Sequence, residues 1–333
     1  MTQLTPLEKK ILQVLEDGDF HSGSQLSEEF AVSRTAVWKA VRSLIHHHSV
    51  SIESRKGLGY RLAHVSKLLN QRKLTAHFNA CNCHFVCLDE IDSTNLHAMT
   101  LVQEGCWPVV VLAERQVLGR GRRGRSWLSP FAGGVWLSFG FRLKQAVTAL
   151  KAYSLVVAVI TCEVLRAQFE KDFCIKWPND LYFQDKKLGG ILIEISGDPD
   201  SDVCVVVGIG INVDMQACAS EAVGQPYTDL YSVTGSPVDR HPLIISIVEA
   251  LLNSLERINE EFFASYRSKW NELDLLLGKS VRVNYGSQEL DGVAMGVTSE
   301  GELMVQLETG DSFSLSSGEV SVRVSPTTSG LLQ

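Results

Sequence analysis

The sequence of 333 residues is short of two features that mark membrane and secreted proteins: long hydrophobic runs and paired cysteines. No apolar run reaches the roughly 18 residues needed to span a bilayer. The eight cysteines are scattered without the spacing of a disulfide framework, which favours a reducing compartment. The first residues combine charge with an amphipathic pattern, unlike the apolar centre of a signal peptide. We therefore expect a cytoplasmic protein with no membrane partner.

Internal repeats are also missing, and the chain has few clustered metal ligands. Cys81, Cys83, His84 and Cys87 gather, but they lack the paired C-x2-C elements of a zinc site, so no dedicated metal centre is expected. With 45% hydrophobic and 21% charged residues, the chain is typical of a globular protein with two or three domains. Its net charge of −7 excludes a uniformly basic nucleic-acid binder but allows one basic module.

The first 64 residues contain such a basic module. A helical pattern over residues 6–16 is followed by the Ser-x-x-Gln capping box that begins at Ser22, and Ser33 can cap a third helix after a tight turn. This pattern predicts a helix-turn-helix over residues 23–42, and residues 50–62 predict a β-hairpin wing. From Arg34 to Arg61 there are six basic residues and one acidic residue, a net charge of +5. The residues expected to contact DNA are Ser33, Arg34, Lys39, Arg42 and Lys56. The alternative is a winged helix used only for packing or protein contacts.

A second basic segment, from Gly119 to Trp127, contains three glycines, four arginines and no acidic residue. Glycine allows the backbone to approach a ligand closely, and arginine suits carboxylate and phosphate groups. The segment lies between two predicted strands, Val109 to Gln116 and Gly134 to Phe141. Loops between sheet strands commonly carry ligand-binding groups, so a binding site is favoured over a solvated basic loop.

Other polar motifs also follow predicted strands. Ser93, Thr94 and Asn95 come after the strand His84 to Ile91, where they can either cap a helix or bind a small polar ligand. Gly208 and Gly210 interrupt an apolar strand that ends at Asn212, and glycine within a strand often marks the close approach of a ligand or another backbone. Leu243 to Arg267 is expected to be helical. Short strands broken by glycines from Lys279 to Val324 predict a small β-barrel.

Five motifs in order resemble one family, the bifunctional biotin protein ligases that also act as repressors of the biotin operon. The motifs begin with Asp92-Ser93-Thr94-Asn95, followed by Gln116 with Gly119 to Trp127, then Lys176-Trp177-Pro178-Asn179-Asp180-Leu181, Lys187-Leu188-Gly189-Gly190-Ile191 and Gly208-Ile209-Gly210-Ile211-Asn212. The resemblance implies a multidomain α+β chain. Residues 1–64 are then a winged helix-turn-helix, residues 65–276 a mixed-sheet α/β ligase core like that of class II synthetases, and residues 277–326 a small SH3-like β-barrel.

The resemblance also implies a reaction in two steps, with ATP and biotin as substrates and Mg²⁺ accompanying ATP. Biotin is first activated as biotinyl-5′-AMP, and a lysine of a carrier protein then attacks the mixed anhydride. Biotin is expected to contact Ser93, Thr94, Asn95, Gln116, Arg120, Gly121, Arg122 and Lys187. Arg122 and Lys187 are the expected catalytic cations, because positive charge favours a transition state in which phosphate charge develops. Trp127, Asn179 and Asn212 are candidates for the adenylate side.

The expected partners follow from the same resemblance. They are the biotin carboxyl carrier protein of acetyl-CoA carboxylase, operator DNA and a second copy of the chain when the adenylate is bound. Two alternatives stay open. A lipoate or octanoyl ligase can share the core and its adenylation chemistry, although the basic segment and the DNA-binding module argue against it. A ligand-sensing repressor with an inactive core is the other, and the presence of Arg120, Arg122 and Lys187 argues against that.

Overall fold

A computed structural model describes residues 3–63, 67–143, 150, 152–198, 202–216, 224–255, 258, 262–285, 288–316 and 320–324. The chain divides into two compact units. The first contains residues 1–143 and 192–248, and the second contains residues 144–191 and 249–333. Among the helices of the described residues, none combines the length and the apolar character that spanning a bilayer requires.

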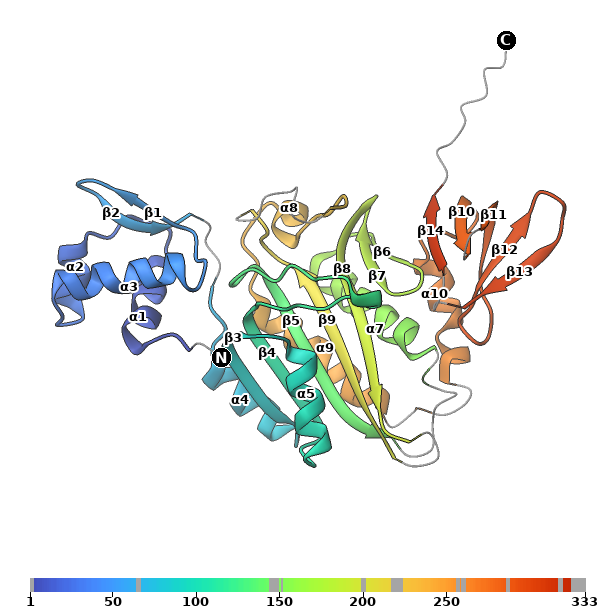
Figure 1. The fold of residues 1–333 in the computed structure, drawn as a ribbon, viewed down its shortest axis with the longest axis horizontal. Helices are drawn as coiled ribbons and strands as arrows, with labels where there is room; N and C mark the ends of the chain where they lie inside the picture. The colour runs from blue at the N-terminus through green and yellow to red at the C-terminus, as the bar shows by residue number, and fades with distance from the viewer. Residues whose placement is uncertain are drawn as a thin grey trace, which may run out of the picture. The chain divides into compact units, whose positions relative to one another are not determined.

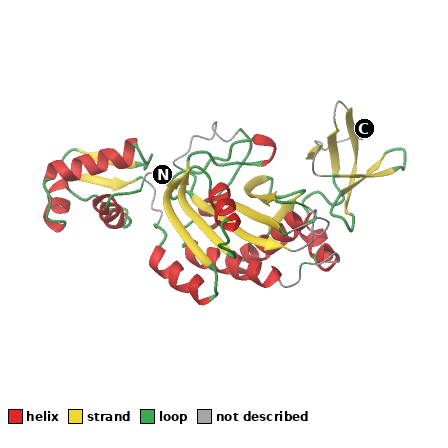
Figure 2. Ribbon diagram, turned by 60° about the horizontal axis from the view of Figure 1, so that its bottom comes forward, coloured by secondary structure: helices red, strands yellow, loops and turns green. Residues whose placement is uncertain are grey.

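The first unit begins with the predicted winged helix (Figures 1 and 2). Its helices are α1 (Pro6–Leu15), α2 (Gly23–Glu29) and α3 (Arg34–His46), and its wing is the antiparallel pair β1 (Ile52–Arg55) and β2 (Gly59–Leu62). All three N-caps use side chains: Thr5 and Ser22 form capping boxes, and the hydroxyl of Ser33 accepts from the backbone N–H of Ala36 at 3.1 Å. An apolar core that includes Leu12, Leu26 and Leu44 holds the three helices together.

The rest of the first unit is built on a mixed sheet. Its strands are β3 (His84–Ile91), β4 (Val109–Gln116), β5 (Gly134–Leu143) and β9 (Val203–Asn212), which lie side by side in that order. β3 and β4 are parallel, whereas β5 is antiparallel to both β4 and β9. α5 (Thr94–Gln103) packs on β4, β5 and β9, and α4 (Gln71–Ala80) packs on β3. Continuous burial of β4 and β5 explains why these strands read as apolar runs in the sequence.

The second unit contains α7 (Tyr153–Phe169), which packs on β6 (Phe173–Lys176) and β7 (Asp180–Phe183). β6 pairs with β7, and β7 pairs with the first half of β8 (Lys186–Ser196). The motif from Lys187 to Ile191 lies inside β8. The C-terminal domain is the predicted β-structure, an antiparallel sheet in the order β13-β12-β11-β10-β14. Trp177 belongs to this unit, and its indole N–H donates to the carbonyl of Gly301 at 3.1 Å.

The five strands of that domain are β10 (Ser280–Tyr285), β11 (Gln288–Val297), β12 (Leu303–Leu307), β13 (Ser312–Leu315) and β14 (Val320–Val324). The prediction of one helix from Leu243 to Arg267 is wrong. α9 (Arg240–Leu255) ends twelve residues earlier, a short 3-10 turn covers Phe262–Ser265, and α10 (Arg267–Leu273) is a separate helix. The break allows Phe263 and Trp270 both to be buried, at 4% and 0% exposure.

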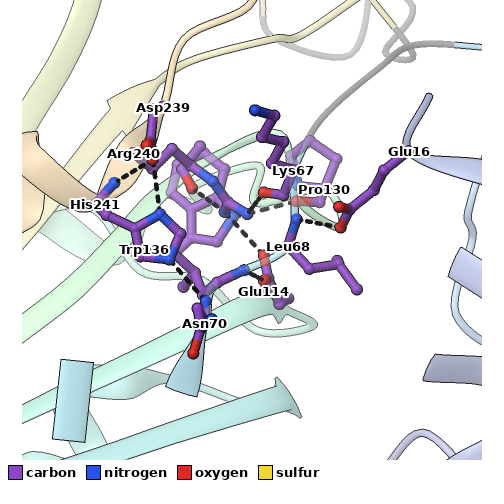
Figure 3. Close-up of polar contacts among 12 residues, drawn as sticks. Glu16, Lys67, Leu68, Asn70, Glu114, Pro130, Trp136, Asp239, Arg240 and His241 are labelled. Carbon is purple, nitrogen blue, oxygen red and sulfur yellow. Dashed lines mark hydrogen bonds and ion pairs between the residues drawn. The ribbon is translucent and has the colours of Figure 1, made fainter. Parts of the chain in front are cut away.

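The connecting segment Lys67 to Asn70 follows the winged helix. Three of its successive backbone N–H groups donate to side chains of other elements (Figure 3). The N–H groups of Leu68, Leu69 and Asn70 donate to Glu16, Glu114 and His241 at 2.8, 2.6 and 2.7 Å. Leu68 and Leu69 are half-buried, and three successive hydrogen bonds to side chains of other elements give this segment one defined path. It is a connection built into the first unit.

A buried ion pair lies at the centre of this connection. Arg240 and Glu114, each less than 5% exposed, have their nitrogen and oxygen 2.8 Å apart. Arg240 also donates to the carbonyls of Lys67 at 2.7 Å and Gly134 at 3.0 Å, so it joins the connecting segment, β4 and the start of β5. An ion pair this deeply buried is costly to break, since the remaining charge is left without a partner.

His241 extends the same arrangement. Its Nε2 accepts the N–H of Asn70, so the ring proton lies on Nδ1, which donates to Asp239 at 2.6 Å. Partial burial of Asp239 opposes its ionisation, but hydrogen bonds from the backbone N–H and the ring of His241 outweigh that effect and lower the pKa of the carboxyl. A charged carboxylate thereby fixes the tautomer that the connecting segment needs.

Replacing Arg240 with methionine should reduce the free energy of unfolding by about 3–5 kcal/mol, because Glu114 would stay buried without its partner. The double variant Arg240→Met with Glu114→Gln should lose less than the sum of the two single losses. Urea unfolding of the full chain measures both. As a control, Arg282→Met breaks the exposed pair with Asp291 and should leave the midpoint nearly unchanged. Equal effects of the buried and exposed substitutions would contradict this account.

Candidate adenylate-forming site

The first turn of α5 is capped by a side chain from the neighbouring strand. Ser93 is the N-cap residue, but it makes no side-chain capping hydrogen bond. The backbone N–H and the hydroxyl of Thr94 instead donate to Oε1 of Gln116, the last residue of β4, at 2.9 and 3.0 Å. Ser93, Thr94 and Asn95 are all buried, at 2–5% exposure. The sequence left open whether these residues cap the helix or bind a ligand. In the structure the cap comes from Gln116 of β4.

Asn95 is the most constrained of these residues. Its Nδ2 donates to the carboxylate of Glu194 at 2.8 Å and to the carbonyl of Leu192 at 3.4 Å, and both partners can only accept. The amide orientation is therefore fixed, and Oδ1 accepts the hydroxyl of Ser138 at 2.6 Å. Ser138 is fully buried on β5 and also lies 2.8 Å from the hydroxyl of Thr94. Two strands, β5 and β8, thus hold one amide.

Ser138 and Glu194 are site residues that the sequence analysis missed. Each has a weak signal in the sequence. Ser138 is the one polar residue of the apolar run from Val135 to Phe141, and Glu194 is the one charge in the run from Ile191 to Ile195. A buried polar residue needs partners, but only the sheet order shows that these partners are Thr94 and Asn95.

The two glycines of β9 leave space for site residues. A Cβ at Gly208 would lie 2.9 Å from Cγ of Asn95, and a Cβ at Gly210 would lie 2.7 Å from Nε1 of Trp127. Real Cβ atoms do not approach other atoms so closely, so both positions exclude a side chain. The sequence predicts the close approach of a ligand or another backbone at these glycines. The atoms that the structure brings close are instead side chains, those of Asn95 and Trp127.

The basic segment forms a short hairpin. Gln116 pairs with Ser129 and Arg120 pairs with Ser126 as isolated bridges, and the N–H of Gly121 donates to the carbonyl of Arg125 at 2.7 Å. Arg122 begins the 3-10 turn at the tip. The guanidinium of Arg120 lies 3.1 Å from Glu194, so Glu194 contacts two predicted ligand residues, Asn95 and Arg120. An anionic ligand of Arg120 has to share or displace this carboxylate.

The other predicted site residues have structural partners. In the first unit, Nδ2 of Asn212 donates to the carbonyl of Thr228 at 3.0 Å, which ties the end of β9 to the segment after it. In the second unit, Lys187 forms a 2.8 Å ion pair with Asp180, and Asn179 exchanges two hydrogen bonds with the backbone of Ile191. The structure brings Ser93, Thr94, Asn95, Gln116, Arg120 and Trp127 together in the first unit. The ligand contacts of all these residues, including Arg122, stay predictions.

Cys83, just before β3, and Cys87, within β3, are poorly suited to act as nucleophiles. Burial raises the pKa of Cys83 and of Cys87 to about 12, so both are neutral thiols near pH 7. All cysteines that the described residues include are free.

Fold and site together define a class of protein: a winged helix-turn-helix joined to an α/β ligase core with a small C-terminal β-domain. Models of three families match these parts. They are the HTH domain at residues 8–61, the Biotin/lipoate A/B protein ligase family at residues 88–212, and the Biotin protein ligase C terminal domain at residues 276–323.

Known proteins resemble the chain over nearly its whole length. It is 34% identical to the bifunctional ligase/repressor BirA of Escherichia coli over 314 residues, which are 94% of this chain and 96% of that protein. It is 27% identical to the Bacillus subtilis protein of the same name, over 91% of this chain and 95% of that one. The solved biotin protein ligase of Aquifex aeolicus, in complex with biotin and ATP, is 32% identical with a TM-score of 0.62 and covers 73% of this chain and 99% of its own. The chain therefore belongs to the family of bifunctional biotin ligase/repressors.

Gly208→Ala should weaken biotin binding at least about tenfold, or roughly 1.4 kcal/mol, because the new methyl group displaces the amide of Asn95. Ser138→Ala removes one hydrogen bond to Asn95 without a collision. It should weaken the free energy of biotin binding by about 0.5–1.5 kcal/mol. Isothermal titration calorimetry with biotin measures both losses.

Gly23→Ala, at the start of α2, is the matched control. Its Cβ would make an ordinary 3.7 Å contact with the ring of Tyr60. This variant should bind biotin as the unmodified chain does. If Gly208→Ala also binds normally while remaining folded, Asn95 is not part of the biotin site.

Proposed function

We propose that this chain is an ATP-dependent biotin protein ligase that also represses transcription by binding operator DNA. As a ligase it forms biotinyl-5′-AMP and pyrophosphate, then transfers biotin to a lysine of a biotin carboxyl carrier protein. The observation that carries the proposal is the fixed polar cluster of Thr94, Asn95, Gln116 and Ser138, in a chain that belongs to the ligase/repressor family.

The polarity of this cluster suits the ureido ring of biotin. That ring has two N–H donors and one carbonyl acceptor. Oδ1 of Asn95 uses one lone pair for Ser138 and has a second to offer an N–H. Gln116 has two Nε2 protons, of which the 2.9 Å hydrogen bond to Ser129 uses one. The cluster therefore offers both an acceptor and a donor in fixed orientations. Ser93 and Thr94 complete the ring contacts.

The basic hairpin serves the anionic end of the substrates. Arg120, Arg122 and the backbone N–H of Gly121 bind the biotin carboxylate and then the phosphate of the adenylate, to which guanidinium groups donate well. A carboxylate oxygen of biotin attacks the α-phosphorus of ATP, and pyrophosphate leaves. Trp127, Asn179 and Asn212 support the adenylate side. The intermediate is held noncovalently, so the chain supplies orientation, charge and exclusion of water.

Lys187 provides the cation for the α-phosphate, where charge develops in the transition state. Its 2.8 Å pair with Asp180 holds its side chain in place. Mg²⁺ would accompany ATP and would be held mainly by phosphate oxygens and water, a mode of binding that this ion commonly adopts.

The second activity uses the winged helix. Ser33, Arg34, Lys39, Arg42 and Lys56 lie on α3, its cap and the wing, and they contact the phosphates and bases of the operator. Because one winged helix reads a short site, repression needs two copies of the chain. An exposed sheet edge of the ligase core supplies both the homodimer interface and the docking site of the carrier protein. The protein works in the cytoplasm, where both partners are found.

The test of the ligase activity is exchange of radiolabelled pyrophosphate into ATP in the presence of biotin or lipoate. Exchange that depends on biotin is the expected result. Exchange with lipoate alone would support a lipoate ligase instead. No exchange with either acid, from protein that binds biotin and DNA, would identify a repressor with an inactive core.

Lys187→Ala should lower the rate of adenylate formation at least about tenfold, equivalent to about 1.4 kcal/mol of barrier, while biotin affinity changes less. Single-turnover quench experiments measure the adenylate directly. Lys186→Ala removes the same charge from the exposed neighbouring position and is the matched control. Normal single-turnover formation by Lys187→Ala would show that the role given to Lys187 is wrong.

Biotinyl-5′-AMP should strengthen self-association by a coupling free energy of about 1–3 kcal/mol, because a ligand that orders site loops removes part of the entropy cost of forming the dimer. Sedimentation velocity with and without the adenylate measures this coupling. Unmodified carrier protein should compete with the dimer. An adenylate that leaves the monomer–dimer equilibrium unchanged would remove the basis for ligand-controlled repression.

A further inference from the structure

Trp38 lies on the outer face of the recognition helix. The inner face of α3 contributes Val37, Val41 and Leu44 to the apolar core, at 0–2% exposure. Trp38 points away from that core and is 46% exposed. Trp136, Trp177 and Trp270 are only 0–3% exposed, whereas Trp107 is 45% exposed but lies outside the recognition helix. A large aromatic surface that the fold itself does not bury is suited to burial against a partner.

The exposed face of α3 has mixed chemistry. It consists of Thr35, Trp38, Lys39 and Arg42, all exposed and spaced three or four residues apart. The guanidinium carbon of Arg42 lies 5.0 Å from the ring centroid of Trp38, one helical turn away. This distance is typical of a cation–π contact. The contact restricts the rotamers of Arg42, and a guanidinium with five N–H donors keeps donors for a base edge.

We propose that Trp38 and Arg42 form a base-reading pair, in which Trp38 contacts a thymine methyl group and positions Arg42 on a neighbouring guanine. The inference rests on the proposed binding of operator DNA. A recognition helix in the major groove faces both groups, because thymine presents its C5 methyl there and guanine presents the N7 and O6 acceptors that arginine binds. Trp38 contributes apolar contact and orientation, and Arg42 contributes the directional hydrogen bonds.

This role differs from that of the basic residues around it. Arg34, Lys39 and Lys56 are exposed cations suited to phosphate contacts, which raise affinity for every sequence and add to its salt dependence. Trp38 carries no charge. Its loss should therefore reduce discrimination between sequences and leave the salt dependence as it was.

The experiment begins with a duplex selected from a random-sequence pool by the full-length protein in the presence of biotin and ATP. Each thymine of that duplex is then replaced in turn by deoxyuridine, which removes only the methyl group. At one thymine of each half-site, the replacement should weaken binding by the unmodified protein about fourfold, the value expected for one buried methyl group. Trp38→Ala should bind both duplexes equally, and Trp38→Phe should recover part of the difference.

Two further measurements separate base reading from a structural role. Trp38→Ala should keep biotin-dependent pyrophosphate exchange, and the slope of log affinity against log salt should stay unchanged. Lys39→Ala is the contrasting variant, whose slope should fall by about one unit. Arg42→Ala should lose guanine preference at a position next to the sensitive thymine, and the losses of the Trp38 and Arg42 variants should not add.

The inference is overturned if deoxyuridine replacement affects the unmodified protein and Trp38→Ala equally. It is also overturned if Trp38→Ala weakens selected and random duplexes by the same factor, or abolishes the dimer while keeping the base preference. Those results would assign Trp38 to helix packing or to contact with a second copy. If the unmodified protein selects no sequence from the pool, the repressor proposal itself fails, and this inference fails with it.

Discussion

The amide of Asn95 is the group on which the geometry of the site depends most. It is almost fully buried, so each of its polar atoms needs a partner within the fold. Those partners come from Ser138 on β5 and from Leu192 and Glu194 on β8, while Gly208 of β9 provides the space. A shift of any of these strands would leave a buried polar atom unpaired. The sheet therefore specifies the orientation of one side chain, and with it the donors and acceptors open to a ligand.

The same requirement explains how the connecting segment and the site are built on one strand. Glu114 and Gln116 are two residues apart on β4. Glu114 accepts the N–H of Leu69 and pairs with Arg240, whereas Gln116 accepts the N–H of Thr94. Strand β4 therefore ends in two acceptors that satisfy backbone donors of different segments. Each contact is local, yet together they give the connecting segment and the start of α5 defined positions on one sheet.

Much of the fold could be predicted from the sequence because local signals agree with the tertiary structure. The capping boxes at Thr5 and Ser22 mark helix starts, and the apolar run of β4 ends at Gln116 as expected. Ser138 and Glu194 could not be assigned, because an isolated polar residue in an apolar strand acquires meaning only from its neighbours in the sheet. Trp38 could not be assigned either, because its place in the helical pattern does not show that the ring is exposed and lies against the guanidinium of Arg42. The separation of α9 from α10 could not be predicted either, because it goes with the burial of Phe263 and Trp270, which is a tertiary contact.

We propose the fixed cluster around Asn95 as the binding site for the ureido ring of biotin, with Arg120 at the carboxylate. A crystal structure of the full chain with biotin would decide this. The ring is expected to contact Thr94, Asn95 and Gln116, and the biotin carboxylate is expected to lie on Arg120 in place of the carboxylate of Glu194. Biotin bound elsewhere, with the 3.1 Å pair of Arg120 and Glu194 intact, would contradict it.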